Sequence, residues 1–173
     1  MAQIKSSIPS EHMAVIGAGL VGSLWALMLA QRGHRVDIYE RRPDPRVGSY
    51  KGGRSINLAL SNRGWRALEK AGIAEEVRKI ALPITHRTMH ATDGALTRQP
   101  YGLPNEKGLF DDPQCIYSVS RGLLNKLLVE KSEAHRDVAY HFGQQCEDVD
   151  LEQARVTLRN RDGQQNEQKF DRV

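Results

Sequence analysis

The sequence has 173 residues, with 25 Lys and Arg against 21 Asp and Glu, which gives a formal net charge of +4. A hydrophobic content of 39% with 27% charged residues is typical of a soluble globular protein and excludes a disordered or fibrous chain. The length is enough for about one domain with a real core. Two cysteines, Cys115 and Cys146, are too few for a disulfide framework, so we expect free thiols and a cytoplasmic protein.

The positive charge does not indicate a nucleic-acid partner. Nucleic-acid binders usually concentrate Lys and Arg on one face, whereas here the basic residues are scattered apart from a short group at Arg41, Arg42 and Arg46. Aromatic residues make up only 6% and do not interleave with that group. We expect a polar N-terminal tail over residues 1–12 and a single folded domain over residues 13–173.

Residues 13–30 carry no charge, and a stretch of this length can cross a membrane. Its internal pattern predicts something else. Residues 13–16 are a short apolar run typical of a buried parallel strand, residues 17–22 are rich in glycine, and residues 23–31 favour a helix. A second apolar strand over residues 36–39 ends on Glu40. The order strand, glycine turn, helix, strand predicts no membrane segment.

The glycine turn has the spacing GxGxxG at Gly17, Gly19 and Gly22. The first glycine of such a motif allows a tight turn, the second lets a pyrophosphate approach the backbone, and the third lets the helix pack closely on the sheet. The helix N-terminus then offers free N–H groups and its positive dipole end to the phosphates. Together these elements predict a site for an ADP-containing dinucleotide.

Glu40 stands 18 residues after Gly22, at the end of the second strand. A carboxylate there can accept hydrogen bonds from ribose hydroxyls and would repel a 2′-phosphate. NAD and FAD are therefore both open, and NADP is disfavoured at this site, although Arg41 and Arg42 leave it possible.

The segment after Glu40 departs from an NAD dehydrogenase, which would continue at once with a second helix and a third strand. Residues 41–53 form an irregular basic stretch in which prolines and glycines break any helix. A helix is predicted over about residues 62–71, closed by Gly72.

Four stretches carry a family resemblance: residues 15–22 (VIGAGLVG), 39–42 (YERR), 53–60 (GRSINLAL) and 99–102 (QPYG). The chain resembles the kynurenine 3-monooxygenase family of FAD-dependent aromatic hydroxylases from residue 13 to about residue 173. The resemblance implies an α/β fold, namely an incomplete Rossmann-like FAD-binding domain with part of the substrate-binding region and a small β-meander. It also implies bound FAD, NADPH as co-substrate, and hydroxylation of L-kynurenine to 3-hydroxykynurenine.

The resemblance assigns site residues as well. Arg87 and Tyr101 would hold the substrate carboxylate and Asn57 would lie near the active site, although without the resemblance Arg87 reads as an ordinary surface residue. No catalytic triad or metal is expected, and His86 and His90 read as solvated. The residues expected near FAD are Gly17, Gly19, Leu20, Val21, Gly22, Tyr39, Glu40, Arg41, Arg42, Arg54, Ala59, Arg121 and Cys146.

Further strands are predicted from alternating apolar residues. One covers residues 84–91 with a turn at 93–94, inside a substrate-contacting region of about 84–102. Another covers 116–120 and leads into a helix with Ser120 as a plausible N-cap. A strand at 138–142 is followed by a meander with strands at 146–151 and 155–159, a turn at 161–163, and a final strand starting at 168–171.

Parts of the family pattern are missing. Such hydroxylases carry a second fingerprint, Gly-Ala-Asp-Gly, and a later Gly-Asp motif, and neither occurs here. We therefore expect an N-terminal portion that does not turn over alone. Another aromatic hydroxylase and a non-catalytic ADP- or FAD-binding fragment remain alternatives. A full-length eukaryotic homologue would belong at the mitochondrial outer membrane rather than in the cytoplasm.

Overall fold

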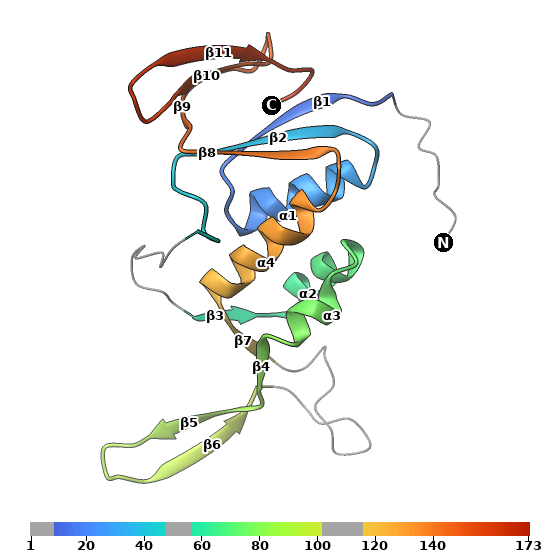
Figure 1. Ribbon diagram of the computed structural model, residues 1–173. Coiled ribbons are helices and arrows are strands. Elements are labelled where there is room, and N and C mark those ends of the chain that lie inside the picture. The colour runs from blue at the N-terminus through green and yellow to red at the C-terminus, as the bar shows by residue number, and fades with distance from the viewer. Residues whose placement is uncertain (1–8, 48–56, 102–115) are drawn as a thin grey trace. The chain divides into compact units, whose positions relative to one another are not determined.

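The computed structural model describes residues 9–47, 57–101 and 116–173 and divides the chain into two compact units. The first unit is built from residues up to 51 and from 125 onward, and the second from residues 52–124. Figure 1 shows the elements of each unit in chain order.

The first unit centres on a parallel sheet in the order β1-β2-β8. Its strands are β1 (His12–Ile16), β2 (Arg35–Glu40) and β8 (Val138–Phe142), and helix α1 (Leu20–Ala30) connects β1 to β2. The predicted strand, turn, helix and strand are confirmed, with α1 starting at Leu20, earlier than expected. Within the described ranges, no helix is both long and apolar enough to span a bilayer.

Both faces of this sheet are covered, which explains its apolar strands. On one face Val36 and Ile38 pack against α1 and are 0% exposed. The other face packs against an antiparallel meander in the order β11-β10-β9, where Val156 and Leu158 are buried beside Tyr39. The meander consists of β9 (Gln145–Asp150), β10 (Arg155–Arg159) and β11 (Gln165–Lys169).

Helix α4 (Arg121–Glu133) begins in the second unit and continues into the first, where it precedes β8. Leu128 and Val129 are buried, and the Ser132 Oγ lies 2.6 Å from the Tyr140 hydroxyl. This hydrogen bond joins the end of α4 to β8 on the α1 face of the sheet.

The second unit holds an antiparallel sheet in the order β3-β7-β4, from β3 (Asn57–Leu60), β7 (Ile116–Ser120) and β4 (Ala81–Ile84). Helices α2 (Asn62–Lys70) and α3 (Ala74–Arg78) follow β3. Trp65 of α2 is 1% exposed, and its ring meets the Tyr117 ring edge-on with 4.9 Å between the centroids. The Arg78 guanidinium lies 4.8 Å from the centroid of the Trp65 ring. Trp65 is therefore the centre of this core.

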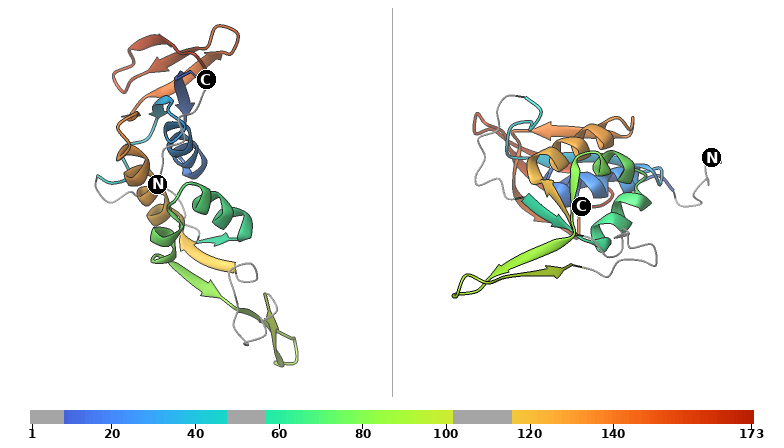
Figure 2. Two further views of the ribbon diagram at one scale, coloured as in Figure 1. Left: turned by 90° about the vertical axis from the view of Figure 1, so that its right-hand side faces the viewer. Right: turned by 90° about the horizontal axis from the view of Figure 1, so that it is seen from below.

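Strands β5 (His86–His90) and β6 (Leu96–Pro100) form a two-stranded ribbon that extends away from the other strands of its unit (Figures 1 and 2). Every residue in both strands is exposed. Such a ribbon gains little from burial, because two strands without a covering layer are marginally stable in water.

Several element boundaries differ from the sequence prediction. The strand expected over 84–91 is two strands, because β4 pairs with β7 while β5 pairs with β6. The last meander strand covers Gln165–Lys169 rather than starting at 168, and its exposed polar residues hide it from an apolar pattern. Beyond it, the Asp171 N–H donates to the His12 carbonyl, so the chain turns alongside β1.

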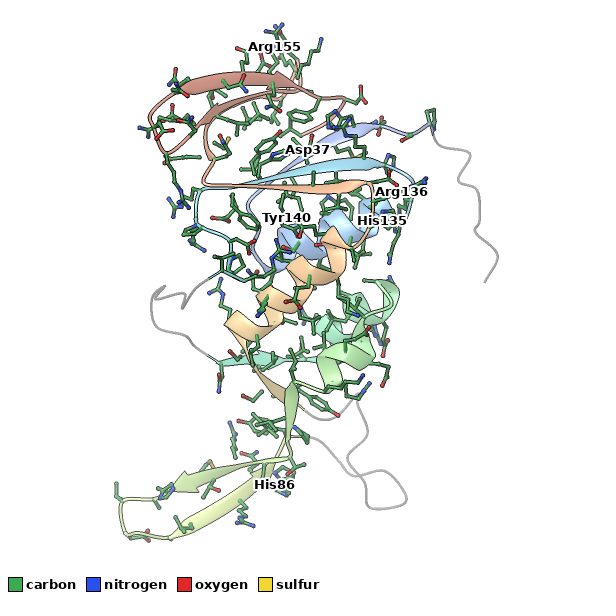
Figure 3. The ribbon with its side chains drawn as sticks, viewed as in Figure 1. Asp37, His86, His135, Arg136, Tyr140 and Arg155 are labelled. Carbon is green, nitrogen blue, oxygen red and sulfur yellow. The ribbon has the colours of Figure 1, made fainter. Side chains whose placement is uncertain are left out.

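One buried acid ties the parallel sheet together under the meander. Asp37 on β2 is 5% exposed, and its two carboxylate oxygens lie 2.6 Å from His12 Nε2 and 3.2 Å from His141 Nε2. Figure 3 shows Asp37 on the meander side of the sheet and Tyr140 on the other side. Because His12 is on β1 and His141 on β8, this cluster joins all three strands through side chains.

We expect Asp37→Asn to lower the free energy of unfolding by about 1–3 kcal/mol, since one oxygen becomes an amide that cannot accept from the second imidazole. Urea unfolding followed by circular dichroism measures the change. Asp162→Asn is the matched control at an exposed site and should change stability by less than about 0.5 kcal/mol. Equal effects of the two variants would contradict a structural role for Asp37.

Candidate functional site

The glycine turn after β1 has a geometry that larger residues cannot adopt. Gly17 has φ +100°, and its N–H donates to the Tyr39 carbonyl at 2.8 Å. A Cβ on Gly22 would lie 2.0 Å from the Gly17 oxygen, so only glycine lets α1 pass this close to the turn. A Cβ on Gly19 would meet nothing within 4 Å, which leaves open space over its backbone.

The N-terminus of α1 is unblocked at this turn. Gly19 is the N-cap, no side chain among the described residues caps the helix, and its first turn contains no acidic residue. The N–H groups of Leu20 and Val21 belong to the first turn and have no intrahelical partner, and such groups are the ones with which a helix N-terminus binds an anion. The Val21 side chain beside them is 82% exposed.

Glu40 lies at the carboxyl end of β2, beside this turn. Its Oε2 accepts the Ala18 N–H at 3.0 Å, and its Oε1 accepts the Arg42 N–H at 2.9 Å. A carboxylate has about four acceptor positions, so two remain for ribose hydroxyls after these bonds. The carboxylate is thus fixed between the glycine turn and the loop that follows β2.

Tyr39 contributes to the turn through its carbonyl, because its side chain lies on the opposite side under the meander. The ring is 3% exposed and stacks on His141 at 4.7 Å, and its hydroxyl donates to Gln168 Oε1 at 2.5 Å. Burial, aided by the nearby Asp37 charge, raises the pKa of Tyr39 to about 12.

Cys146, Arg41 and Arg42 lie near the same end of the sheet as Glu40. The Gln144 N–H donates to the Glu40 carbonyl at 3.0 Å, which places β9 and Cys146 just beyond it. Burial raises the pKa of the Cys146 thiol, and Asp148 adds to this, so the thiol is unsuited to nucleophilic chemistry. Arg41 and Arg42 are exposed.

The second unit brings another group of predicted residues together. Asn57 pairs with Ser120 across β3 and β7, and Arg121, the first residue of α4, follows Ser120 in the chain. Ala59 pairs with Ser118 on the same two strands. Arg54, also expected near the cofactor, lies outside the described residues.

Arg87 and Tyr101, the predicted carboxylate-binding pair, share one face of the β5–β6 ribbon. Arg87 is opposite Gln99, whose Oε1 accepts from the Arg87 Nε at 2.8 Å. The Tyr101 N–H donates to the Thr85 carbonyl at 2.9 Å and extends the ladder by one pair. Alternation along the strands then makes Arg87 and Tyr101 diagonal neighbours, within reach of a common small ligand.

Metal chemistry has no candidate site in the part of the chain that the structure describes, where no cluster of three His, Cys, Asp or Glu has suitable geometry. The sequence prediction missed two groups of charged residues, the Asp37 cluster and an ion cluster around Arg46. Both join residues far apart in the sequence, and no local pattern marks them.

Substitutions at Gly19 and Gly22 should have different effects on nucleotide binding and on stability. Gly19→Ala should leave the free energy of unfolding within about 1 kcal/mol of the parent, because the Cβ meets open space, yet weaken ADP and FAD binding by about tenfold or more by filling that space. Gly22→Ala should cost about 1–3 kcal/mol of stability through overpacking against the Gly17 carbonyl. Chemical unfolding and ligand titration measure both, and a stability loss at Gly19 larger than at Gly22 would refute the assignment.

Tyr39 makes alkaline stability depend on pH. Its pKa is higher in the folded protein than the ordinary value of 10, so its contribution is complete below pH 10 and is lost as the pH rises toward about 12. Tyr39→Phe should therefore show a shallower loss of stability than the parent between these pH values. Parallel unfolding curves at pH 9 to 12 provide the test, and identical slopes would contradict it.

A family profile described as an FAD binding domain matches residues 11–171. Kynurenine 3-monooxygenase from Myxococcus xanthus is 44% identical over 153 residues, which cover 88% of this chain and 32% of that protein. Kynurenine 3-monooxygenase from Flavobacterium johnsoniae is 41% identical over 165 residues, 95% of this chain and 34% of that protein. The chain thus spans about a third of the length of these relatives.

Solved structures agree on the fold. The flavin-dependent monooxygenase PieE, in complex with FAD and substrate, aligns with a TM-score of 0.71 at 21% identity, covering 93% of this chain and 29% of that chain. The p-nitrophenol 4-monooxygenase PnpA from Pseudomonas putida aligns with a TM-score of 0.70 at 19% identity, covering 91% and 38%. With the profile match over nearly the whole sequence, these findings show that the chain belongs to the FAD binding domain family and is related to the FAD-dependent monooxygenases.

Proposed function

We propose that this chain is the FAD-binding part of a monooxygenase that hydroxylates L-kynurenine to 3-hydroxykynurenine, with NADPH and O2 as co-substrates. The observation that carries the proposal is Glu40, held by the Ala18 and Arg42 N–H groups beside the uncapped N-terminus of α1. Identities of about 40% to curated kynurenine 3-monooxygenases support the choice of reaction. The low cysteine count supports a cytoplasmic location.

The described residues fit FAD at its ADP end. The Leu20 and Val21 N–H groups would donate to the pyrophosphate, the open backbone at Gly19 would admit it, and Glu40 would accept from the ribose hydroxyls. When bound, FAD supplies the redox chemistry, taking electrons from NADPH and activating O2. The residues of the protein bind the cofactor and orient it.

The substrate end of the proposal rests on the β5–β6 ribbon. The Arg87 guanidinium can pair with the amino-acid carboxylate of kynurenine in a bidentate geometry, and Gln99 holds that guanidinium in place. The Tyr101 hydroxyl on the same face can donate to the same carboxylate. Asn57, paired with Ser120, and Arg121, the next residue after Ser120, are the further residues that we assign to the reaction centre.

A second candidate is an ADP- or FAD-binding chain without turnover of its own. Arg87 and Tyr101 are both exposed, the latter to 42%, so they do not by themselves shield a substrate ring from water. Such shielding is required for the reaction to be efficient. We therefore propose that the 173-residue chain binds FAD but does not complete the hydroxylation alone.

A third candidate is a hydroxylase for a different aromatic acid. Arg87 can donate hydrogen bonds to any carboxylate, so specificity for kynurenine rests on sequence similarity rather than on geometry. NADPH oxidation by a longer protein that contains this chain, compared between kynurenine and 4-hydroxybenzoate, separates the two. Stimulation by 4-hydroxybenzoate alone would favour the third candidate.

The purified chain should bind FAD, seen as quenching of flavin fluorescence, and Glu40→Gln should weaken this binding by about tenfold, because a charged acceptor is lost. Asp162→Asn, a change at an exposed carboxylate, should leave FAD binding unaltered.

When the purified chain is supplied with FAD, NADPH and kynurenine, chromatography should detect no 3-hydroxykynurenine. Product formation would contradict the proposed lack of turnover, and absence of FAD binding would contradict the cofactor assignment.

A further inference from the structure

The loop after β2 is fastened by an ion cluster around Arg46. The Arg46 Nε and Nη2 donate to the two carboxylate oxygens of Asp44 at 2.9 and 2.7 Å, and the Arg46 N–H donates to Asp44 Oδ1 at 2.8 Å. The Arg46 Nη1 donates to a carboxylate oxygen of Glu133, 87 residues later on α4. The Arg46 and Asp44 side chains are only 24% and 19% exposed, so water weakens these bonds less than at an open surface.

Aromatic rings also attach the loop after β2 to the rest of the first unit. The Arg46 guanidinium lies 5.9 Å from the centroid of the Phe142 ring, a cation–π distance. Phe142 stacks on Tyr140 at 5.4 Å, and the Tyr140 hydroxyl bonds to Ser132 on α4. Figure 3 shows Tyr140 between the sheet and the helices. Arg46 therefore joins the loop to β8 and to α4 at once.

The same loop is hydrogen-bonded to Glu40, the acid that we propose to bind ribose. Arg42 donates its N–H to Glu40 Oε1, and its carbonyl accepts from the Gly143 N–H at 3.2 Å. Pro43 and Pro45 fix their own φ angles, so little freedom remains between this attachment and Arg46. A displacement of Arg46 would thus be transmitted to the Arg42 N–H.

The charges in the cluster make Arg46 indispensable to it. One guanidinium faces two carboxylates, Asp44 and Glu133, and Lys126 on α4 adds a weaker attraction to Asp44. Hydrogen bonds from Arg46 lower the pKa of Asp44 below its ordinary value, because they favour the charged carboxylate. Without Arg46, the two carboxylates would repel each other and the loop would lose its attachment to α4.

We propose that Arg46 is a positioning residue for ribose recognition: by fixing the loop to Asp44, Glu133 and Phe142, it holds the Arg42 N–H in place and so aims the Glu40 carboxylate at the ribose hydroxyls. The inference rests on the proposed FAD site and goes beyond it, since among the described residues Arg46 bonds to Asp44 and Glu133, which are not assigned to that site. A purely structural arginine would change affinity for all nucleotides equally, whereas a positioning residue changes the discrimination between ribose and deoxyribose.

The experiment compares ADP with 2′-deoxy-ADP by calorimetry on the whole chain. The parent should prefer ADP by about tenfold, the value of one hydrogen bond to a charged group. Arg46→Gln and Glu133→Gln should each reduce this preference severalfold, and Arg46→Lys should restore part of it. Arg155→Gln removes a comparable arginine, paired with Glu167 in the meander, and should leave the preference unchanged. An equal loss of affinity for both nucleotides, or no loss in either Gln variant, would overturn the proposal.

Amide hydrogen exchange in the absence of nucleotide tests the loop directly. Arg46→Gln should speed exchange at the Arg42 amide by about tenfold, while the Val156 amide in the meander keeps the parent rate. An unchanged Arg42 rate would overturn the proposal even if the chain bound no ADP. Absence of ADP binding with faster Arg42 exchange would instead refute the proposed cofactor site alone. Glu133→Gln leaves Arg46 and Asp44 in place and serves if Arg46→Gln does not fold.

Discussion

The close approach of α1 to the Gly17 carbonyl is the constraint on which the first unit depends. With no Cβ at Gly22, the helix starts directly at the carboxyl end of β1. Parallel strands end at the same edge, so the helix N-terminus and the last residue of β2 meet there. The Gly17 N–H bond to Tyr39 and the Ala18 N–H bond to Glu40 both require this proximity. A methyl group at position 22 would push α1 away from the turn and would lengthen or break both bonds.

Strand β2 divides its residues between two functions. Ile38 faces α1 and contributes to the core, whereas Asp37 and Tyr39 face the meander. Asp37 joins β2 to β1 and β8 through His12 and His141, and Tyr39 joins β2 to the meander through Gln168. The side chain of Glu40, the last residue of β2, bonds instead to the glycine turn and to the loop after β2. Stability and the proposed recognition of ribose are thus set by neighbouring positions of one strand.

Local patterns predicted much of the fold and little of the tertiary contacts. The strand, glycine turn, helix and second strand follow from short-range periodicity and from the special geometry of glycine, and the structure confirms them. Helix α3 spans five residues, too few to show a period, and the exposed strand β6 has no apolar alternation. Asp37 meets His141, 104 residues away, and Arg46 meets Glu133, 87 away, so neither contact leaves a trace in the local sequence. The shared face of Arg87 and Tyr101 likewise needed the register of β5 and β6.

The central claim is that the ADP part of FAD binds where α1 begins and Glu40 ends β2. Backbone NMR of the chain during titration with ADP tests this most directly, because each amide reports its own environment. We predict that the amide signals of Ala18, Leu20, Val21 and Arg42 shift together and saturate at one affinity, while those of the β5–β6 ribbon stay in place. Saturation without any shift at the glycine turn, or shifts confined to the second unit, would contradict the account.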